Sequence, residues 1–200
     1  MIEAYRLIDK LEREHSLSLL EYKTLIEAEN DALRLYAANK AKEQATSIYG
    51  NSVYVRGLIE VGNYCRNDCF YCGIRKSNLN CDRYILVEED ILHCCKEGYE
   101  LGFRTFVLQG GEGIYKKDFV TNVVQKIRSE YPDCAITLSL GEEDRDTYKA
   151  WFEAGANRYL LRHETASKNH YEKLHPKNMS FDHRMQCIKD LKEIEYQEGC

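Results

Sequence analysis

The sequence has no apolar run long enough to cross a membrane, and only two of its 200 residues are proline. A membrane-spanning helix needs about 18 or more consecutive apolar residues. The amino-terminal stretch MIEAYRLIDKLEREHS has helical periodicity and mixed charge in place of the apolar segment of a signal peptide. We therefore expect a cytoplasmic chain that does not associate with membranes.

The sequence also lacks an excess of positive charge. Its 28 lysines and arginines are outnumbered by 33 acidic residues, which gives a net charge of -5. Proteins that bind nucleic acids usually carry a basic face, so nucleic acid is not an expected partner. With 44% apolar and 30% charged residues, the composition is that of an ordinary globular chain.

The chain has nine cysteines, but they do not indicate a disulfide framework. Their number is odd, and disulfide-rich domains are typically small secreted ones. Metal or redox chemistry is the better explanation for those that cluster. The scattered cysteines are expected to be small buried apolar side chains; they are Cys81, Cys94, Cys95, Cys134 and Cys187.

Hydrophobic periodicity divides the chain into a helical extension, residues 1–50, and a domain, residues 51–200. In the extension, Ser18 and Glu21 have the spacing of a capping box. In the domain, short apolar runs alternate with amphipathic segments. The runs predict strands at 53–62, 105–110, 135–141 and 157–164, and the amphipathic segments predict helices at 88–101, 116–131, 144–154 and 180–196.

This alternation predicts an α/β fold with a parallel sheet. An open doubly wound sheet and a (β/α) barrel both fit the pattern, but every candidate chemical group follows the end of a strand, and in a barrel these ends meet at one mouth. The chain is short for a complete barrel of about 250 residues, and its ending YQEGC resembles the opening of a fifth strand. We therefore expect roughly the first half of a TIM-type barrel, truncated at the start of the fifth strand.

The segment NYCRNDCFYCGIR contains three cysteines in a C-x3-C-x2-C pattern, Cys65, Cys69 and Cys72. A zinc ribbon would need a second cysteine or histidine pair. In a [4Fe-4S] cluster, three thiolates can hold three irons and leave the fourth open to a ligand. The spacing is typical of radical S-adenosylmethionine (SAM) enzymes and favours such a cluster over zinc. Tyr71 and Gly73 would let the loop fold tightly over it.

Three further patterns are candidates for ligand binding. The glycines of QGGEG do not fit a phosphate loop, but Gly111 allows close backbone approach and Glu112 can accept from an ammonium group. Arg162 and Glu164 lie at a strand end, either facing the mouth or paired on the surface. Arg184 has the guanidinium group that matches a carboxylate.

Several segments together resemble the HydE family of radical SAM maturases of [FeFe]-hydrogenase: VYVRGLIEVGNYCRNDCFYCGIRKSN, RTFVLQGGEGIY, ITLSLGE, WFEAGANRYLLRHETA and SFDHRMQCIKDLKE. RHETA is more specific than the cysteine pattern, which biotin synthase and methylornithine synthase share. The chain departs from the family at Gly113 and Ile114, where members carry an acidic residue and a proline.

The resemblance implies a [4Fe-4S] cluster on Cys65, Cys69 and Cys72, and reductive cleavage of SAM to a 5′-deoxyadenosyl radical. It also implies an organometallic substrate, a one-electron reductant, and two partner maturases: a second radical SAM enzyme and a GTPase scaffold. The residues expected to line the SAM pocket are Tyr71, Gln109, Gly111, Glu112, Ser139, Arg162, Glu164 and Arg184.

Two other hypotheses remain open at this point. The chain could be a radical SAM enzyme of the biotin synthase or methylornithine synthase type, acting on another small molecule. It could also be a truncated fragment without catalytic activity.

Overall fold

The computed structural model describes residues 2–199, and its internal contacts divide the chain into two compact units after Tyr54. The first unit holds α1 (Ile2–Glu14), α2 (Leu19–Glu27) and α3 (Asp31–Tyr49). Its small core is built on Ala4, Ile8 and Leu33.

The capping box predicted at the start of α2 is present. The Glu21 backbone N–H donates to Ser18 Oγ at 3.3 Å, and the Ser18 backbone N–H donates to Glu21 Oε2 at 2.8 Å. Two amide groups that the helix leaves without a partner are thereby satisfied.

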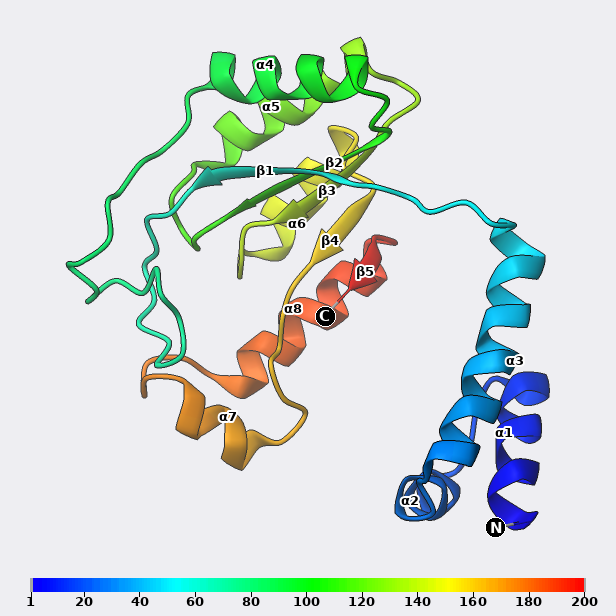
Figure 1. Cartoon of the computed structure of the whole chain (residues 1–200). Helices are drawn as coiled ribbons and strands as arrows, with labels where there is room; N and C mark the ends of the chain where they lie inside the picture. The colour runs from blue at the N-terminus through cyan, green and yellow to red at the C-terminus, as the bar shows by residue number, and fades with distance from the viewer. Residues whose placement is uncertain (1, 200) are drawn as a thin grey trace. The chain divides into compact units, whose positions relative to one another are not determined.

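The second unit alternates strands and helices (Figure 1). Its strands are β1 (Gly57–Gly62), β2 (Thr105–Gly110), β3 (Ala135–Ser139), β4 (Arg158–Leu160) and β5 (Gln197–Gly199). Its helices are α4 (Glu88–Glu100), α5 (Lys117–Glu130), α6 (Arg145–Glu153), α7 (Lys168–Leu174) and α8 (Phe181–Glu193). Among the described residues, no helix combines the length and apolar character needed to cross a bilayer.

The five strands form one sheet in the order β1-β2-β3-β4-β5, with every neighbouring pair parallel. A doubly wound sheet would reverse its strand order at a switch point, and this sheet does not. Sequential parallel order with a helix in each of the crossovers is the arrangement of a (β/α) barrel. The predicted fold class, about half of a TIM-type barrel, is confirmed, as is the fifth strand.

The core lies between this sheet and the helices that pack on it. Phe106, Leu108, Ile136 and Leu138 alternate along β2 and β3 and are almost fully buried. Alternate residues of a strand point to the same face, so these four side chains form one apolar layer. The helices pack in chain order, α4 on α5, α5 on α6 and α6 on α8, which leaves the strand ends for loops.

Some predicted boundaries were wrong. Residues 53–56 are not part of β1, because its ladder with β2 begins at the pair of Gly57 with Phe106 and β2 itself begins only one residue earlier, at Thr105. Val53 is accordingly 86% exposed. The fourth strand ends at Leu160 instead of residue 164, and Glu164 has a positive φ of 63° that a strand cannot contain. Helix α7 was not predicted.

The scattered cysteines divide into two groups. Cys95, Cys134 and Cys187 are buried as predicted, whereas Cys94 is exposed and Cys81 is half-buried. Cys94 and Cys95 are adjacent on α4, so only one of them can face the sheet. The prediction of burial was therefore wrong for Cys94.

Candidate functional site

A cavity opens at the carboxyl ends of the strands, and the loop between β1 and α4 lies over it. The loop supplies the three cysteines, and the ends of β2, β3 and β4 supply most of the other polar groups. All the predicted site residues line this one cavity: Cys65, Cys69, Tyr71, Cys72, Gln109, Gly111, Glu112, Ser139, Arg162, Glu164 and Arg184.

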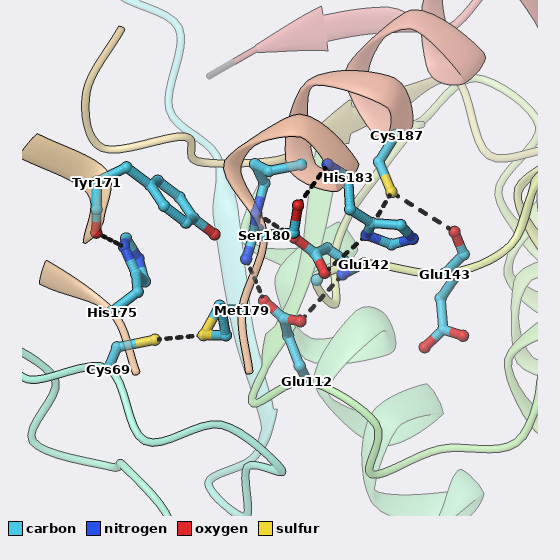
Figure 2. A network of polar contacts seen from close by, with 12 residues as sticks. Cys69, Glu112, Glu142, Glu143, Tyr171, His175, Met179, Ser180, His183 and Cys187 are labelled. Carbon is cyan, nitrogen blue, oxygen red and sulfur yellow. Dashed lines mark hydrogen bonds and ion pairs between the residues drawn. The ribbon is translucent and has the colours of Figure 1, made fainter. Parts of the chain in front are cut away.

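The segment from α7 to the start of α8 contacts the cysteine loop. The Phe70 backbone N–H donates to the Leu174 carbonyl at 3.0 Å, and the Cys69 thiol lies 3.6 Å from the Met179 sulfur (Figure 2). Burial raises the pKa of the Cys69 thiol to about 11. This thiol is therefore protonated at neutral pH unless a positive centre binds it.

The donor set fits a cluster. Cys65, Cys69 and Cys72 are free thiols, and all three open on the same cavity. The Asn67 backbone N–H lies 3.4 Å from Cys65 Sγ, a contact of the kind that tunes iron–sulfur centres. Within residues 2–199, no three histidine, cysteine or acidic side chains are grouped as a single metal ion needs. A cluster differs because each thiolate binds its own iron.

Tyr71 is fixed by a buried histidine. The Tyr71 hydroxyl lies 3.1 Å from His175 Nε2, and His175 Nδ1 lies 2.9 Å from the Tyr171 carbonyl oxygen. Since a carbonyl can only accept, Nδ1 carries a proton, and in that tautomer Nε2 is the acceptor for the Tyr71 hydroxyl. The His175 ring also stacks on Tyr171, with centroids 3.8 Å apart. The orientation of the Tyr71 ring at the cavity is thus set from α7.

Glu112 and Arg184 contact each other directly. Arg184 Nη2 donates to Glu112 Oε1 at 2.8 Å, and Arg184 Nε lies 2.6 Å from Glu142 Oε1. The second contact is an ion pair without the alignment of a hydrogen bond, since neither atom has a hydrogen-bond partner among the residues that the structure describes. Although burial opposes charge, Glu112 and Glu142 raise the pKa of Arg184 above its ordinary value.

Arg66 joins the cysteine loop to the same carboxylates. Its backbone N–H donates to the Glu112 carbonyl at 2.9 Å, and its Nη2 donates to the Glu142 carbonyl at 2.6 Å. The Arg66 guanidinium also lies 3.7 Å from Glu112 Oε2. Two arginines therefore balance the two buried carboxylates, and the network links the loop, the ends of β2 and β3, and α8.

Two glycines make this packing possible. A Cβ on Gly111 would come within 1.8 Å of the Tyr64 carbonyl oxygen, so the loop backbone occupies the space of its missing side chain. Gly141 has a φ of 90°, and a Cβ there would lie 1.7 Å from Glu112 Cγ. Any other residue at Gly141 would displace the carboxylate of Glu112.

The strand ends add a second, more open polar row. Gln109 Nε2 donates to Glu60 Oε1 at 3.0 Å, and Arg162 Nη2 lies 3.4 Å from Gln109 Oε1. Ser139 is the register partner of Gln109 on β3. Glu164 lies beyond the end of β4 and still lines the cavity. These residues present donors and acceptors to the cavity on neighbouring strands.

The Radical SAM superfamily profile matches residues 59–198 of this chain. The chain belongs to the Radical SAM superfamily. The match covers every strand except the first two residues of β1 and the last residue of β5.

Individual relatives agree with this assignment. The chain is 42% identical over 160 residues to the [FeFe] hydrogenase maturase subunit HydE of Thermotoga maritima, covering 80% of this chain and 45% of that protein. It is 31% identical over 174 residues to the 3-methylornithine synthase of Methanosarcina acetivorans, covering 86% and 48%. The crystal structure of methylornithine synthase (PylB) superposes with a TM-score of 0.83 at 29% identity, covering 96% and 57%. The chain spans about half the length of the curated relatives it matches.

Sequence reasoning missed four residues that the structure brings to the site. Glu60 lies inside a predicted strand. The only sequence signal for it was the alternation of side chains along that strand, which turns Glu60 to the face opposite its apolar neighbours. Glu142 and His183 belong to no sequence motif. In the structure His183 Nδ1 lies 3.1 Å from Glu142 Oε2. Arg66 lies within the cysteine motif, at a position where the spacing rule accepts any residue.

Proposed function

We propose that this chain binds a [4Fe-4S] cluster and SAM, and that it serves in building the two-iron site of [FeFe]-hydrogenase. The observation that carries the proposal is the convergence of three free thiols and eight further predicted positions on one cavity. The similarity to HydE supports the assignment to hydrogenase maturation.

In this proposal Cys65, Cys69 and Cys72 hold the cluster, and the polar strand ends hold SAM. When bound and reduced, the cluster would supply the one electron with which SAM is cleaved to methionine and a 5′-deoxyadenosyl radical. The residues assigned to SAM are Tyr71, Gln109, Gly111, Glu112, Ser139, Arg162, Glu164 and Arg184.

Charge assigns different parts of SAM to different residues. The open row places the Arg162 guanidinium and the Glu164 carboxylate at the cavity, where they suit the carboxylate and ammonium groups of a bound amino acid. Glu112 and Arg184 already neutralise each other, with Glu142 as a third member. We assign this triad to shaping the wall that faces SAM and not to supplying a free charge.

In this proposal the substrate is a small organometallic precursor, and the partners are a second radical SAM maturase and a GTPase scaffold. A one-electron reductant supplies electrons to the cluster. The site belongs to the domain at residues 51–200, which follows the helical extension at residues 1–50. We place the chain in the cytoplasm.

The direct test is anaerobic reconstitution of the chain with iron and sulfide. We expect a cubane EPR signal on reduction, a change in that signal when SAM is added, and 5′-deoxyadenosine as a product. Cys65→Ser, Cys69→Ser and Cys72→Ser should each lose the signal, whereas Cys94→Ser should keep it because Cys94 is exposed on α4. Tightly bound zinc in place of iron, or an unchanged signal in Cys72→Ser, would contradict the proposal.

A second candidate function is a radical SAM reaction on another small molecule. The 31% identity to 3-methylornithine synthase and the superposition on PylB favour it. Production of 3-methylornithine by the loaded chain would support this candidate. Genes for the two other maturases beside the gene for this chain would support hydrogenase maturation.

A further inference from the structure

The side chain of Arg83 closes the base of the cysteine loop. Its guanidinium donates to four backbone carbonyls, two through Nη1 and two through Nη2. Nη1 donates to Asn63 and, at 2.9 Å, to Ile74. Nη2 donates to Arg75 at 2.8 Å and to Asn78 at 3.0 Å. One side chain thus joins carbonyls that lie on both sides of the three cysteines in the sequence.

The position of Arg83 is itself fixed by the segment around it. Asn63 Nδ2 donates to the Asp82 carbonyl at 2.6 Å, and the Tyr84 backbone N–H donates to Asn63 Oδ1 at 2.9 Å. The Asn63 backbone N–H in turn donates to the Tyr84 carbonyl at 3.2 Å. Arg83 is therefore anchored at the end of β1, and its guanidinium is hydrogen-bonded to the backbone of the cysteine loop.

The cysteine loop is ordered by local backbone hydrogen bonds and by contacts that Arg66, Phe70 and Tyr71 make with the rest of the site. It contains no helix or strand between Gly62 and Glu88, apart from one isolated bridge. Within it, the Cys72 backbone N–H donates to Cys69 at 3.0 Å, and that of Lys76 donates to Asn67 at 2.8 Å. A loop without regular secondary structure loses much conformational freedom when it is ordered. Arg83 differs from these contacts because its four bonds join Asn63, which precedes the first cysteine, to carbonyls that follow the last one.

We propose that Arg83 is a positioning residue that sets the spacing of Cys65 relative to Cys69 and Cys72 before any cluster binds. The inference rests on the proposed cluster site. A loop already held in its binding geometry gives up less entropy when its ligand binds, so it binds more tightly. Arginine suits the task because its five donors form a rigid fork, whereas lysine carries its three donors on a single nitrogen.

Arg104 provides a matched control. Its guanidinium also donates to backbone carbonyls, those of Tyr99 at 3.2 Å and Phe103 at 2.8 Å. It also lies over a tyrosine ring, 4.0 Å from the Tyr99 centroid, as Arg83 lies 6.0 Å from that of Tyr64. Arg104 precedes β2 and so lies at the opposite end of the strands from the cysteines.

The first experiment compares cluster retention in the reconstituted chain. Under anaerobic challenge with an iron chelator, Arg83→Lys should lose iron about tenfold faster than the unmodified chain, and Arg104→Lys should lose it at the unmodified rate. Equal retention by Arg83→Lys and the unmodified chain overturns the inference alone. If the unmodified chain holds no cluster, the proposed function fails and the inference fails with it.

The second experiment uses the metal-free chain, so it does not depend on loading. In Arg83→Lys, amide hydrogen exchange across residues 63–78 should be at least tenfold faster, while exchange across β2 and β3 is unchanged. An unchanged loop overturns the inference. So does faster exchange in the loop and the strands together, because Arg83 would then support the whole sheet and not the cysteines.

Discussion

Glu112 illustrates how a single side chain connects the site to the stability of the fold. It accepts from Arg184, accepts from the Glu142 backbone N–H at 3.2 Å and lies beside Arg66. Its side chain is only 13% exposed. The side chain of its partner Arg184 is 6% exposed, so losing Glu112 leaves on Arg184 a charge that is largely shielded from water.

We expect Glu112→Gln to lower the free energy of unfolding by about 2 kcal/mol, less than for a fully broken buried pair because Glu142 still faces Arg184. The measurement is urea denaturation followed by circular dichroism. Glu153→Gln is the control, since its pair with Lys149 is 3.7 Å long and mostly exposed, and should change stability by less than about 0.5 kcal/mol. Equal midpoints for the two variants would contradict a structural role for Glu112.

Gly141 gives a second prediction at this scale. Gly141→Ala should lower the free energy of unfolding by at least about 2 kcal/mol, because a side chain at positive φ costs about 1 to 2 kcal/mol and its Cβ would also displace Glu112. Thermal or urea denaturation measures the change. Gly73→Ala is the control within the cysteine loop, since a Cβ there meets nothing within 4 Å. A Gly141→Ala protein as stable as Gly73→Ala would mean that the wall around Glu112 is able to shift.

At the scale of one element, the start of α2 depends on a carboxylate that also binds α1. Lys10 Nζ donates to Glu21 Oε1 at 2.7 Å. This hydrogen bond and those from Ser18 lower the pKa of Glu21 to about 2. The charged form of Glu21 is therefore the one that stabilises the folded unit.

The sign of the pH dependence follows from this lowered pKa. The contribution of Glu21 is fully present above its ordinary pKa of 4.5 and is lost as the pH falls toward 2. Lys10→Ala removes the largest cause, so NMR titration of the Glu21 carboxyl should give a midpoint closer to 4.5. Lys23→Ala is the control, because within residues 2–199 Lys23 pairs with Glu27 and not with Glu21. An unshifted Glu21 titration in Lys10→Ala would show that the cap alone lowers this pKa.

The elements also show what the sequence could and could not predict. The capping box and the buried strand residues were predictable because each depends only on residues that are close together in the sequence. The start of β1 was not, because Val53 and Tyr54 have strand propensity, yet the neighbouring strand offers them no partner. Glu164 was predicted at the end of a strand over residues 157–164, but that strand ends at Leu160 and Glu164 lies beyond it with a positive φ.

For the whole molecule, the order of the strands is what creates the site. Parallel neighbours in sequential order send every strand end to the same side, so motifs from residue 65 to residue 184 meet there. The cysteine spacing and the resemblance were enough to predict the positions along the cavity. The contacts of Glu142, Arg66 and Arg83 were not predictable, because each joins segments whose proximity exists only in the folded chain.

This architecture predicts how ligand binding changes global stability. A cluster and SAM held by the loop and by β2, β3 and β4 would bind the folded unit and not the unfolded chain. At a SAM concentration 100 times its dissociation constant, unfolding should cost about 2.7 kcal/mol more. Anaerobic urea denaturation of the cluster-loaded chain, with and without SAM, measures this difference. Cys72→Ser should show no such gain and Cys94→Ser the full gain, whereas an equal gain in both variants would place SAM away from the cysteine loop.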